Sequence, residues 1–385
     1  MVNQLISKRL GGIEEYYFSK KLREIAGLKA QGVSVFNLGI GSPDIKPPKE
    51  VEEALINGLS DSNYHQYQPY KGIPELRNAF ASWYLQHFSV ALNSETEILP
   101  LIGSKEGIMH ISMAFIDPGD HVLVPNPGYP SYYSASMVAG ADLVHYALSE
   151  DNHYYPDFDA LEAEDLSKVK IMWVNYPHMP TGADGNEKLF NNLLEFSRKH
   201  NIVIVNDNPY AFILTSERHS ILKNRNEDDL VLELNSLSKA HNMAGWRVGA
   251  LAGNRDLVQA VLTFKSNMDS GQFRPIMQAA IAALKLPATW YEALNKEYGK
   301  RRELVFKIAK KLNCTFDPTQ VGMFVWCAIP SNWDHAEKFA DHLLCKYRIF
   351  IPPGTVFGSE GKKYIRFSLC SDTTIWMEVL RRIEE

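Results

Sequence analysis

The sequence Ile202-Val203-Ile204-Val205-Asn206-Asp207, within the run Asn201–Asn206, places four consecutive β-branched residues directly before two polar ones. An uninterrupted apolar run is typical of a strand buried on both faces, because a half-exposed strand would alternate apolar and polar residues. Helical patterns such as Lys105–Phe115 and Glu187–Lys199 lie between several runs of this kind. The alternation predicts an α/β fold in which a mostly parallel, seven-stranded sheet lies between helices. The other six runs are Glu97–Leu101, His121–Pro125, Asp142–Leu148, Val169–Asn175, Val231–Asn235 and Val248–Ala252.

The C-terminal part of the chain follows a different pattern. Tyr291–Leu312 is typical of a charged amphipathic helix, and Met323–Ala328 and Tyr364–Leu369 are typical of strands, with a helix at about Asp334–Tyr347 between them. This order predicts a smaller α+β domain. We expect residues 1–45 to form an N-terminal arm and part of the small domain, residues 46–280 the large domain, and residues 281–385 the small C-terminal domain.

Composition narrows the class of protein. The 385 residues include 40 Lys and Arg against 45 Asp and Glu, a net charge of −5 with no basic stripe, so neither nucleic acid nor a membrane surface is an expected partner. Four cysteines without CxxC spacing indicate neither a zinc site nor a disulfide framework, and no metal is expected. No signal peptide or membrane-spanning stretch is visible, so a cytoplasmic location is expected.

Polar segments follow five of the expected strands. In an open α/β sheet, ligands bind at the carboxyl ends of the strands, so these segments are expected to converge on one site. The five segments are Gly103-Ser104-Lys105, Asn126–Tyr129, Pro177–Gly182, Asp207–Tyr210 and Ser236–Lys239.

Lys239 closes the turn Ser236-Leu237-Ser238-Lys239, and Arg247 follows eight residues later. A lysine amine forms a Schiff base with a carbonyl group, and a guanidinium matches phosphate oxygens in pairs. Together with Ser236 and Ser238, these residues suit an aldehyde cofactor that carries a phosphate. The alternative is a surface lysine in a serine-rich loop.

Asp207 is expected at the mouth of a buried strand, where a carboxylate is costly unless it is paired. Its function would be to pair with the pyridinium nitrogen of pyridoxal phosphate, keeping the ring protonated as an electron sink. The alternative is a residue that caps the next turn. Tyr210 would donate to the ring oxygen of the same cofactor, or else pack beside Pro209.

Three further residues each have a functional and an ordinary interpretation. Ser104 opens a helix whose N-terminus favours a phosphate, and it is equally suited to be a plain N-cap supported by Glu106. Tyr129 would stack on a planar ring or simply pack in a loop. Arg366, in the alternating strand Tyr364–Ser368, is either solvated or turned into a cleft, where it would bind a carboxylate.

Taken in order along the chain, these motifs resemble those of class I, fold-type I pyridoxal-phosphate aminotransferases, and the resemblance covers nearly the whole sequence. The matching motifs are Asn37–Gly41, Tyr67 with Gly72–Arg77, Gly103–Lys105, Asn126–Tyr129, Pro180–Gly182, Asp207 with Tyr210, Ser236–Lys239, Arg247, Pro353-Gly354 with Phe357-Gly358, and Arg366. The resemblance implies amino transfer between an L-amino acid and a 2-oxo acid in two half-reactions.

The resemblance also implies a role for each site residue. Lys239 would hold the cofactor and shuttle the proton, Asp207 would pair with the ring nitrogen, and Tyr210 with the ring oxygen. Arg366 would bind the α-carboxylate with Gly41 nearby. Tyr67 would reach the phosphate of a neighbouring subunit, which implies a homodimer with active sites at the interface. The phosphate would be surrounded by Ser104, Lys105, Ser236, Ser238 and Arg247, with Tyr129 stacked on the ring.

One position departs from the family pattern. The family has Asn-Pro-Thr-Gly, whose asparagine donates to the ring oxygen, and this chain has Met179-Pro180-Thr181-Gly182. Methionine offers only a weak thioether acceptor. We predict that Tyr210 supports the ring oxygen with less help, so that the Schiff base keeps its proton to higher pH than usual, unless another side chain such as Asn175 takes the place of the amide.

The subfamily and the substrate are less clearly indicated. Gly103–Ile108 and Lys265–Gly271 resemble the branch that contains the LL-diaminopimelate aminotransferases, and Tyr16 is similar to a substrate tyrosine of those enzymes. Arg274 either binds a distal carboxylate or is an ordinary solvated arginine. Two other functions share the motifs: a carbon–sulfur β-lyase of the same fold, and a regulator that binds the cofactor without catalysis.

Overall fold

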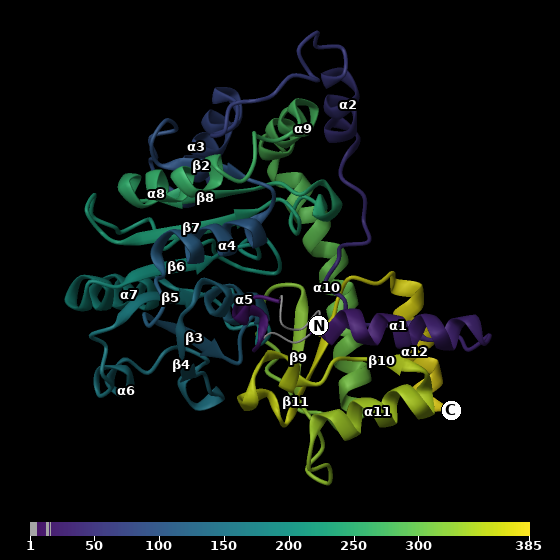
Figure 1. The fold of residues 1–385 in the computed structure, drawn as a ribbon. Coiled ribbons are helices and arrows are strands. Elements are labelled where there is room, and N and C mark those ends of the chain that lie inside the picture. The colour runs from purple at the N-terminus through teal and green to yellow at the C-terminus, as the bar shows by residue number, and fades with distance from the viewer. Residues whose placement is uncertain (1–5, 13–14, 16) are drawn as a thin grey trace.

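A computed structural model describes residues 6–12, 15 and 17–385 of the chain (Figure 1). Its centre is a seven-stranded sheet with the order β2-β8-β7-β6-β5-β3-β4. All its strands are parallel except β8, which is antiparallel to both neighbours. The strands are β2 Ile98–Leu101, β3 His121–Asn126, β4 Asp142–Ala147, β5 Val169–Val174, β6 Val203–Asp207, β7 Val231–Ser236 and β8 Gly249–Gly253.

These strands confirm the expected fold class, since each of the seven apolar runs forms one of them. Successive side chains of a strand enter different layers: Val122 lies in one apolar cluster, and Leu123 lies in the other. Both layers are buried because helices cover both faces of the sheet (Figure 1). This explains why the strands do not alternate apolar and polar residues.

Twelve α-helices lie in the described part of the chain. The expected helices at Lys105–Phe115 and Glu187–Lys199 are observed as α4 and α7. The helices are α1 Tyr17–Ala30, α2 Lys49–Gly58, α3 Pro74–Phe88, α4 Ser104–Phe115, α5 Pro130–Ala139, α6 Phe158–Glu162, α7 Glu187–His200, α8 Arg255–Ser266, α9 Arg274–Leu284, α10 Ala288–Lys311, α11 Ala336–Tyr347 and α12 Thr373–Glu384.

Helix α7 shows how local sequence sets an element's limits. The Asn186 side chain accepts a hydrogen bond from the N–H of Leu189 and caps the N-terminus. Asn201 ends the helix in the left-handed conformation with φ of 55°, which asparagine tolerates better than most residues. Basic side chains in the last turn complement the negative end of the helix dipole.

A second group of elements lies beside the sheet (Figure 1). Strand β9 (Phe324–Ala328) pairs antiparallel with β11 (Tyr364–Ser368), and α11 lies between them in sequence, as expected. Near the N-terminus, β1 (Phe36–Asn37) pairs in parallel with β10 (Ile349–Phe350), a pairing that the sequence did not predict. Helix α1 packs on the same group, with Ile25 in one apolar cluster with Phe350.

None of the helices in residues 6–12, 15 and 17–385 is both long and apolar enough to cross a membrane.

Candidate active site

A cavity of about 570 Å³ opens at the carboxyl edge of the central sheet. Polar segments that follow β2, β3, β5, β6 and β7 reach it, as expected for a parallel sheet. Arg247 reaches the same edge from the other direction, because antiparallel β8 begins there. Of the predicted site residues, those that line the cavity are Gly41, Ser104, Lys105, Tyr129, Asp207, Tyr210, Ser236, Ser238, Lys239, Arg247 and Arg366.

Asp207 ends β6 and is only 4% exposed. Its Oδ2 atom accepts a hydrogen bond of 2.8 Å from the Tyr132 hydroxyl, whereas buried Oδ1 has no partner among the described residues. Burial raises the pKa of this carboxyl to about 7, against the opposing effect of the Tyr132 hydrogen bond. A buried carboxylate oxygen without a donor is costly, so this geometry suits a ligand that brings a cationic N–H group.

The Lys239 amine lies in the same cavity and donates to the carbonyl oxygen of Gly41 at 2.5 Å. Burial lowers the pKa of Lys239 from its usual value. A lysine with a lowered pKa has a larger neutral, nucleophilic fraction at ordinary pH. Lys239 is therefore a partly buried amine that lines the cavity, and not the surface lysine of the alternative interpretation.

Gly103 and Arg247 form the corner of the cavity beside the N-terminus of α4. Gly103 has φ of 79°, and a Cβ atom built on it would lie 2.3 Å from Arg247 Nη2. Arg247 Nη1 donates to the carbonyl of Ala244 at 2.9 Å and to Ser238 Oγ at 3.4 Å. Glycine is required here for both its backbone conformation and its lack of a side chain, which lets the guanidinium lie against the first turn of α4.

Ser104 is the first residue of α4, and Gly103 occupies the N-cap position without a side-chain cap bond. The plain N-cap interpretation of Ser104 is therefore wrong, since its hydroxyl lies inside the helix start and lines the cavity. Lys105 follows it, and burial together with Arg247 lowers the pKa of Lys105. The backbone N–H groups of this turn and the nearby cations suit a phosphate.

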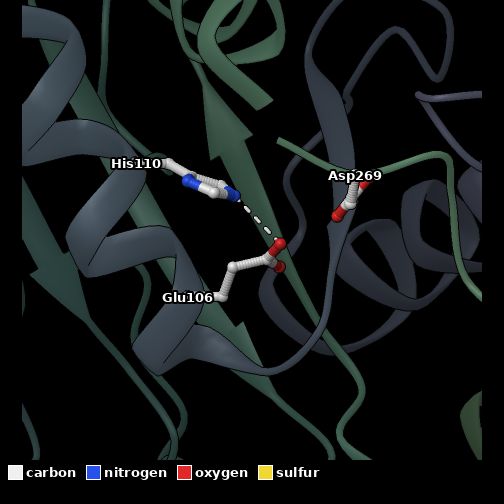
Figure 2. A group of neighbouring side chains, drawn as sticks. All are labelled: Glu106, His110 and Asp269. Atoms are coloured by element: carbon white, nitrogen blue, oxygen red, sulfur yellow. Dashed lines mark hydrogen bonds and ion pairs between the residues drawn. The ribbon is translucent and has the colours of Figure 1, made fainter. Parts of the chain in front are cut away.

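Glu106 supports that turn from behind. One carboxylate oxygen accepts from the N–H of Ile102, and the other accepts from His110 Nε2 at 2.9 Å. Figure 2 shows Glu106 and His110 on α4 facing Asp269 in the segment after α8. Ligand atoms of these three residues lie within 4.8 Å of one another, as in a metal site.

Lys265, whose side chain is 1% exposed, already supplies a positive charge between the two carboxylates of this cluster. Lys265 Nζ donates to Asp269 Oδ2 and lies 3.8 Å from Glu106 Oε1. A metal ion bound to both carboxylates would have to displace this ammonium group. We therefore describe the four residues as a buried ion-pair network that joins α4 to α8.

Arg366, on β11, is 4% exposed and turned into the cavity, not solvated. Its Nη2 atom donates to the Gly39 carbonyl at 2.6 Å, and its guanidinium carbon lies 4.0 Å from the ring centre of Phe324 and 4.5 Å from that of Phe357. The rings and the carbonyl hold the guanidinium in a fixed orientation. A fixed planar cation suits a carboxylate.

Met179 occupies the position where the sequence pattern departs from the family. It is 5% exposed, lines the cavity, and its Sδ atom lies 3.1 Å from Arg366 Nη1. Asn175 lines the same wall, but its side chain is bonded to the backbone: Oδ1 accepts from the Met179 N–H at 2.8 Å, and Nδ2 donates to the Asp207 carbonyl. Asn175 therefore positions both residues.

Of the two remaining predicted residues, one lies away from this cavity and the other is outside the described part of the chain. Tyr67 is 92% exposed and does not line it. Tyr16 lies outside the described residues. Sequence reasoning also missed Tyr132, which follows Tyr129 by one turn of α5 and stacks on Trp173 with ring centres 5.1 Å apart. The spacing of the two tyrosines at the start of a helix was the signal that could have found it.

Comparisons with known proteins identify the family of the chain. A family model described as "Aminotransferase class I and II" matches residues 33–383. The LL-diaminopimelate aminotransferase of Dehalococcoides mccartyi is 38% identical over 366 residues, 94% of each chain. The enzyme of the same name from Aquifex aeolicus is 36% identical over 380 residues, 98% of each chain.

Solved structures with the same fold cover almost the whole chain. Apo-BacF from Bacillus subtillis superposes with a TM-score of 0.94 at 32% identity, over 98% of this chain and 97% of its own. An aromatic aminotransferase from Pyrococcus horikoshii OT3 superposes with a TM-score of 0.85 at 28% identity, over 94% of this chain and 97% of its own.

Proposed function

Because the chain belongs to the class I and II aminotransferases and is therefore a pyridoxal-phosphate-dependent transaminase, we propose that the cavity at the sheet edge is its active site, with Lys239 as the cofactor-binding lysine. The observation that carries this assignment is the unpartnered Oδ1 atom of Asp207. A protonated ring nitrogen would supply the missing donor, and its positive charge would return the raised pKa of Asp207 toward its usual range.

The phosphate is assigned to the opposite corner. The first turn of α4 offers backbone N–H groups, and Arg247 and Lys105 offer positive charge. The hydroxyls of Ser104, Ser236 and Ser238 line the same part of the cavity. Asp207 and this corner would thus hold the two ends of the cofactor, with Tyr129 against its ring and Tyr210 at the ring oxygen.

Lys239 and Arg366 act on the substrate. Arg366 binds the α-carboxylate and so orients the α-carbon toward Lys239 Nζ. Lys239 Nζ, with its lowered pKa, accepts the α-proton of the substrate and then donates a proton in the step that completes the amino transfer. When bound, the cofactor supplies the electron sink for the charge left on that carbon.

The test is a half-reaction followed by absorbance. The purified enzyme with cofactor is mixed with one L-amino acid, and the visible band of the cofactor disappears as the 2-oxo acid forms. Lys239→Ala is expected to abolish this reaction, and Lys188→Ala, at an exposed lysine on α7, to leave it unchanged. Full activity of the Lys239→Ala enzyme would overturn the assignment.

We also propose a homodimer, supported by the surface near Tyr67. Tyr67, Tyr70 and Phe273 are 92%, 50% and 45% exposed, and the backbone of Gln68 lies against Gly271. Neighbouring exposed aromatic side chains indicate a protein interface, because water solvates them poorly. A second subunit that covers this surface would receive Tyr67 at its phosphate. A cytoplasmic location fits the four free cysteines of the described chain.

The substrates are defined by class and not by a single compound. The amino donor and acceptor are an L-amino acid and a 2-oxo acid, and the names of the curated relatives make LL-diaminopimelate one candidate donor. Such a donor carries a second charged end, which the cavity would have to bind.

A further inference from the structure

We infer that the site selects amino donors with apolar side chains over donors whose side chain ends in a charge. The preferred side chains have the size of methionine, leucine or phenylalanine. This inference rests on the proposed transamination. The inference follows from what remains of the cavity wall after the cofactor and the α-carboxylate are placed.

The two substrate anchors define where the side chain goes. If Arg366 takes the α-carboxylate and Lys239 Nζ the α-proton, the cavity lining supplied by α1 and the segment after β1 is left for the substrate side chain. That wall consists of Phe18 and Leu22 on α1 and Ile40 before Gly41, with the Phe324 ring beside them. Among the described residues of α1 and of the segment after β1 that line the cavity, the polar ones are Ser19 and Ser42.

The charged side chains that line the cavity, in the part of the chain described, all have other positions to fill. Lys105 and Arg247 face the phosphate corner, and Arg366 faces the α-carboxylate. Asp207 and Lys239 hold the cofactor, Asp207 at its ring and Lys239 through the covalent bond. A second carboxylate or ammonium group on the substrate would therefore lie in the cavity without a counter-charge from the described lining residues, which is unfavourable.

Three basic residues outside the cavity lining are paired with carboxylates. Arg274, the candidate for a distal carboxylate, does not line the cavity, and its Nε donates to Asp61 Oδ2 at 2.7 Å. On α1, Lys21 Nζ lies 2.9 Å from Glu24, and Arg23 is bonded to Glu15. These pairs leave the positive charge of the three side chains balanced within the chain.

The shape of the wall favours a medium or large side chain. Phe18, Leu22, Ile40 and Phe324 all offer apolar surface to a side chain in the cavity. The binding of a side chain there is favoured in proportion to the apolar surface that it buries. The side chain of alanine is too small to make that contact. A charged side chain can make it only if its charge is removed from water, which is unfavourable.

The experiment measures the second-order rate constant of the half-reaction with the full-length enzyme and its cofactor. The apolar donors are L-methionine, L-leucine and L-phenylalanine, and the charged donors are L-aspartate, L-glutamate and LL-diaminopimelate. We expect the best apolar donor to exceed each charged donor by roughly 100-fold, as when a site lacks a partner for a buried polar group. A charged donor that reacts as fast as the best apolar donor would overturn the inference alone. Absence of reaction with every donor would overturn the proposed transamination as well.

Two variants test the wall itself. Leu22→Arg places a cation on it and is expected to raise the rate constant for L-aspartate or L-glutamate at least about tenfold and to lower that for L-methionine. Leu85→Arg is the matched control, because Leu85 is 57% exposed on α3 and does not line the cavity. An unchanged preference in Leu22→Arg would count against the assigned wall.

Arg274→Gln tests whether this arginine serves the site of a neighbouring subunit. We expect the order of donors to stay the same in this variant. Loss of the reaction with acidic donors alone would show a distal carboxylate site and overturn the inference.

Discussion

The charge of the buried Asp207 carboxyl depends on whether the cofactor is bound. Its pKa rises from 3.8 to about 7 in the folded protein. At a pH between these two values, Asp207 is protonated in the cofactor-free folded protein and ionised in the unfolded chain. The unfolding free energy therefore falls as pH rises through this window. We expect the melting temperature of the cofactor-free protein, relative to that of Asp207→Asn, to decrease from about pH 5 to about pH 8. A difference that is constant with pH would contradict the raised pKa.

Met179 gives a second prediction at this scale. Met179→Asn restores an amide donor near the ring oxygen, which weakens the hold on the proton shared with Lys239 Nζ. The pH midpoint of the visible absorbance change is expected to fall by about one unit or more, equivalent to about 1.4 kcal/mol. Met179→Leu keeps the volume without adding a donor and is expected to titrate like the natural protein. A midpoint in Met179→Asn equal to that in Met179→Leu would show that the amide does not reach the oxygen.

Sequence reasoning found Asp207 and Lys239 because each follows a buried strand, and the edge of a parallel sheet brings such positions together. It did not find Phe324, and it named Phe357 only as part of a family motif, without its contact with Arg366. Their contact with the arginine depends on how distant segments pack, and no local pattern encodes that packing.

At the scale of elements, the start of α4 depends on Gly103. Gly103→Ala would place a Cβ against Arg247 and force a left-handed backbone on alanine, which costs roughly 1–2 kcal/mol. We expect the cofactor dissociation constant, measured by fluorescence titration, to rise at least about tenfold. Gly119→Ala is the matched control, because its φ is 93° and no atom lies within 4 Å of the added Cβ. It should lose a similar amount of stability at unchanged cofactor affinity, and equal affinity in both variants would contradict the close approach.

The ion-pair network behind α4 is a further test at this scale. Lys265→Met leaves the carboxylates of Glu106 and Asp269 close together without the ammonium group between them. Breaking a buried pair in this way costs about 3–5 kcal/mol, so denaturant unfolding should shift strongly. Added Zn²⁺ is expected not to raise the melting temperature of the natural protein, and a clear rise would favour the metal interpretation of the same residues.

The direction of β8 shows the limit of pattern reasoning about elements. The run Val248–Ala252 predicted a buried strand, and β8 is one, but an apolar run does not encode the direction of the strand. Residues 237–248, which join β7 to β8, hold no α-helix that could cross over the sheet, and the chain returns antiparallel along its neighbour. Arg247 reaches the site for that reason.

For the whole molecule, the position of Tyr67 predicts shared active sites. If Tyr67 serves the neighbouring subunit, Tyr67→Ala weakens the cofactor affinity of a dimer, and a hybrid with Lys239→Ala subunits recovers one site that has both natural residues. We expect hybrids formed by co-expression of the two chains to regain up to half the activity of the natural dimer. Hybrids with no recovered activity would show that Tyr67 acts within its own subunit or not at all.

The arrangement of the N-terminal segment could not be read from the sequence. Its two-residue strand β1 is too short to form a pattern, and it pairs with β10 more than 300 residues later. Only the folded chain shows that the elements at both ends lie side by side (Figure 1).

That pairing has a consequence for the order in which the protein is made. Residues 38–41 are held by the last part of the chain: Leu38 donates to Phe350, and Gly39 and Ile40 accept from Arg366 and Ser368. Because Gly41 accepts from Lys239, one wall of the cavity is missing until the C-terminal strands have left the ribosome. The last strand of the central sheet ends at Gly253. Lys239 and the whole sheet are therefore synthesised well before the C-terminal strands that complete the cavity.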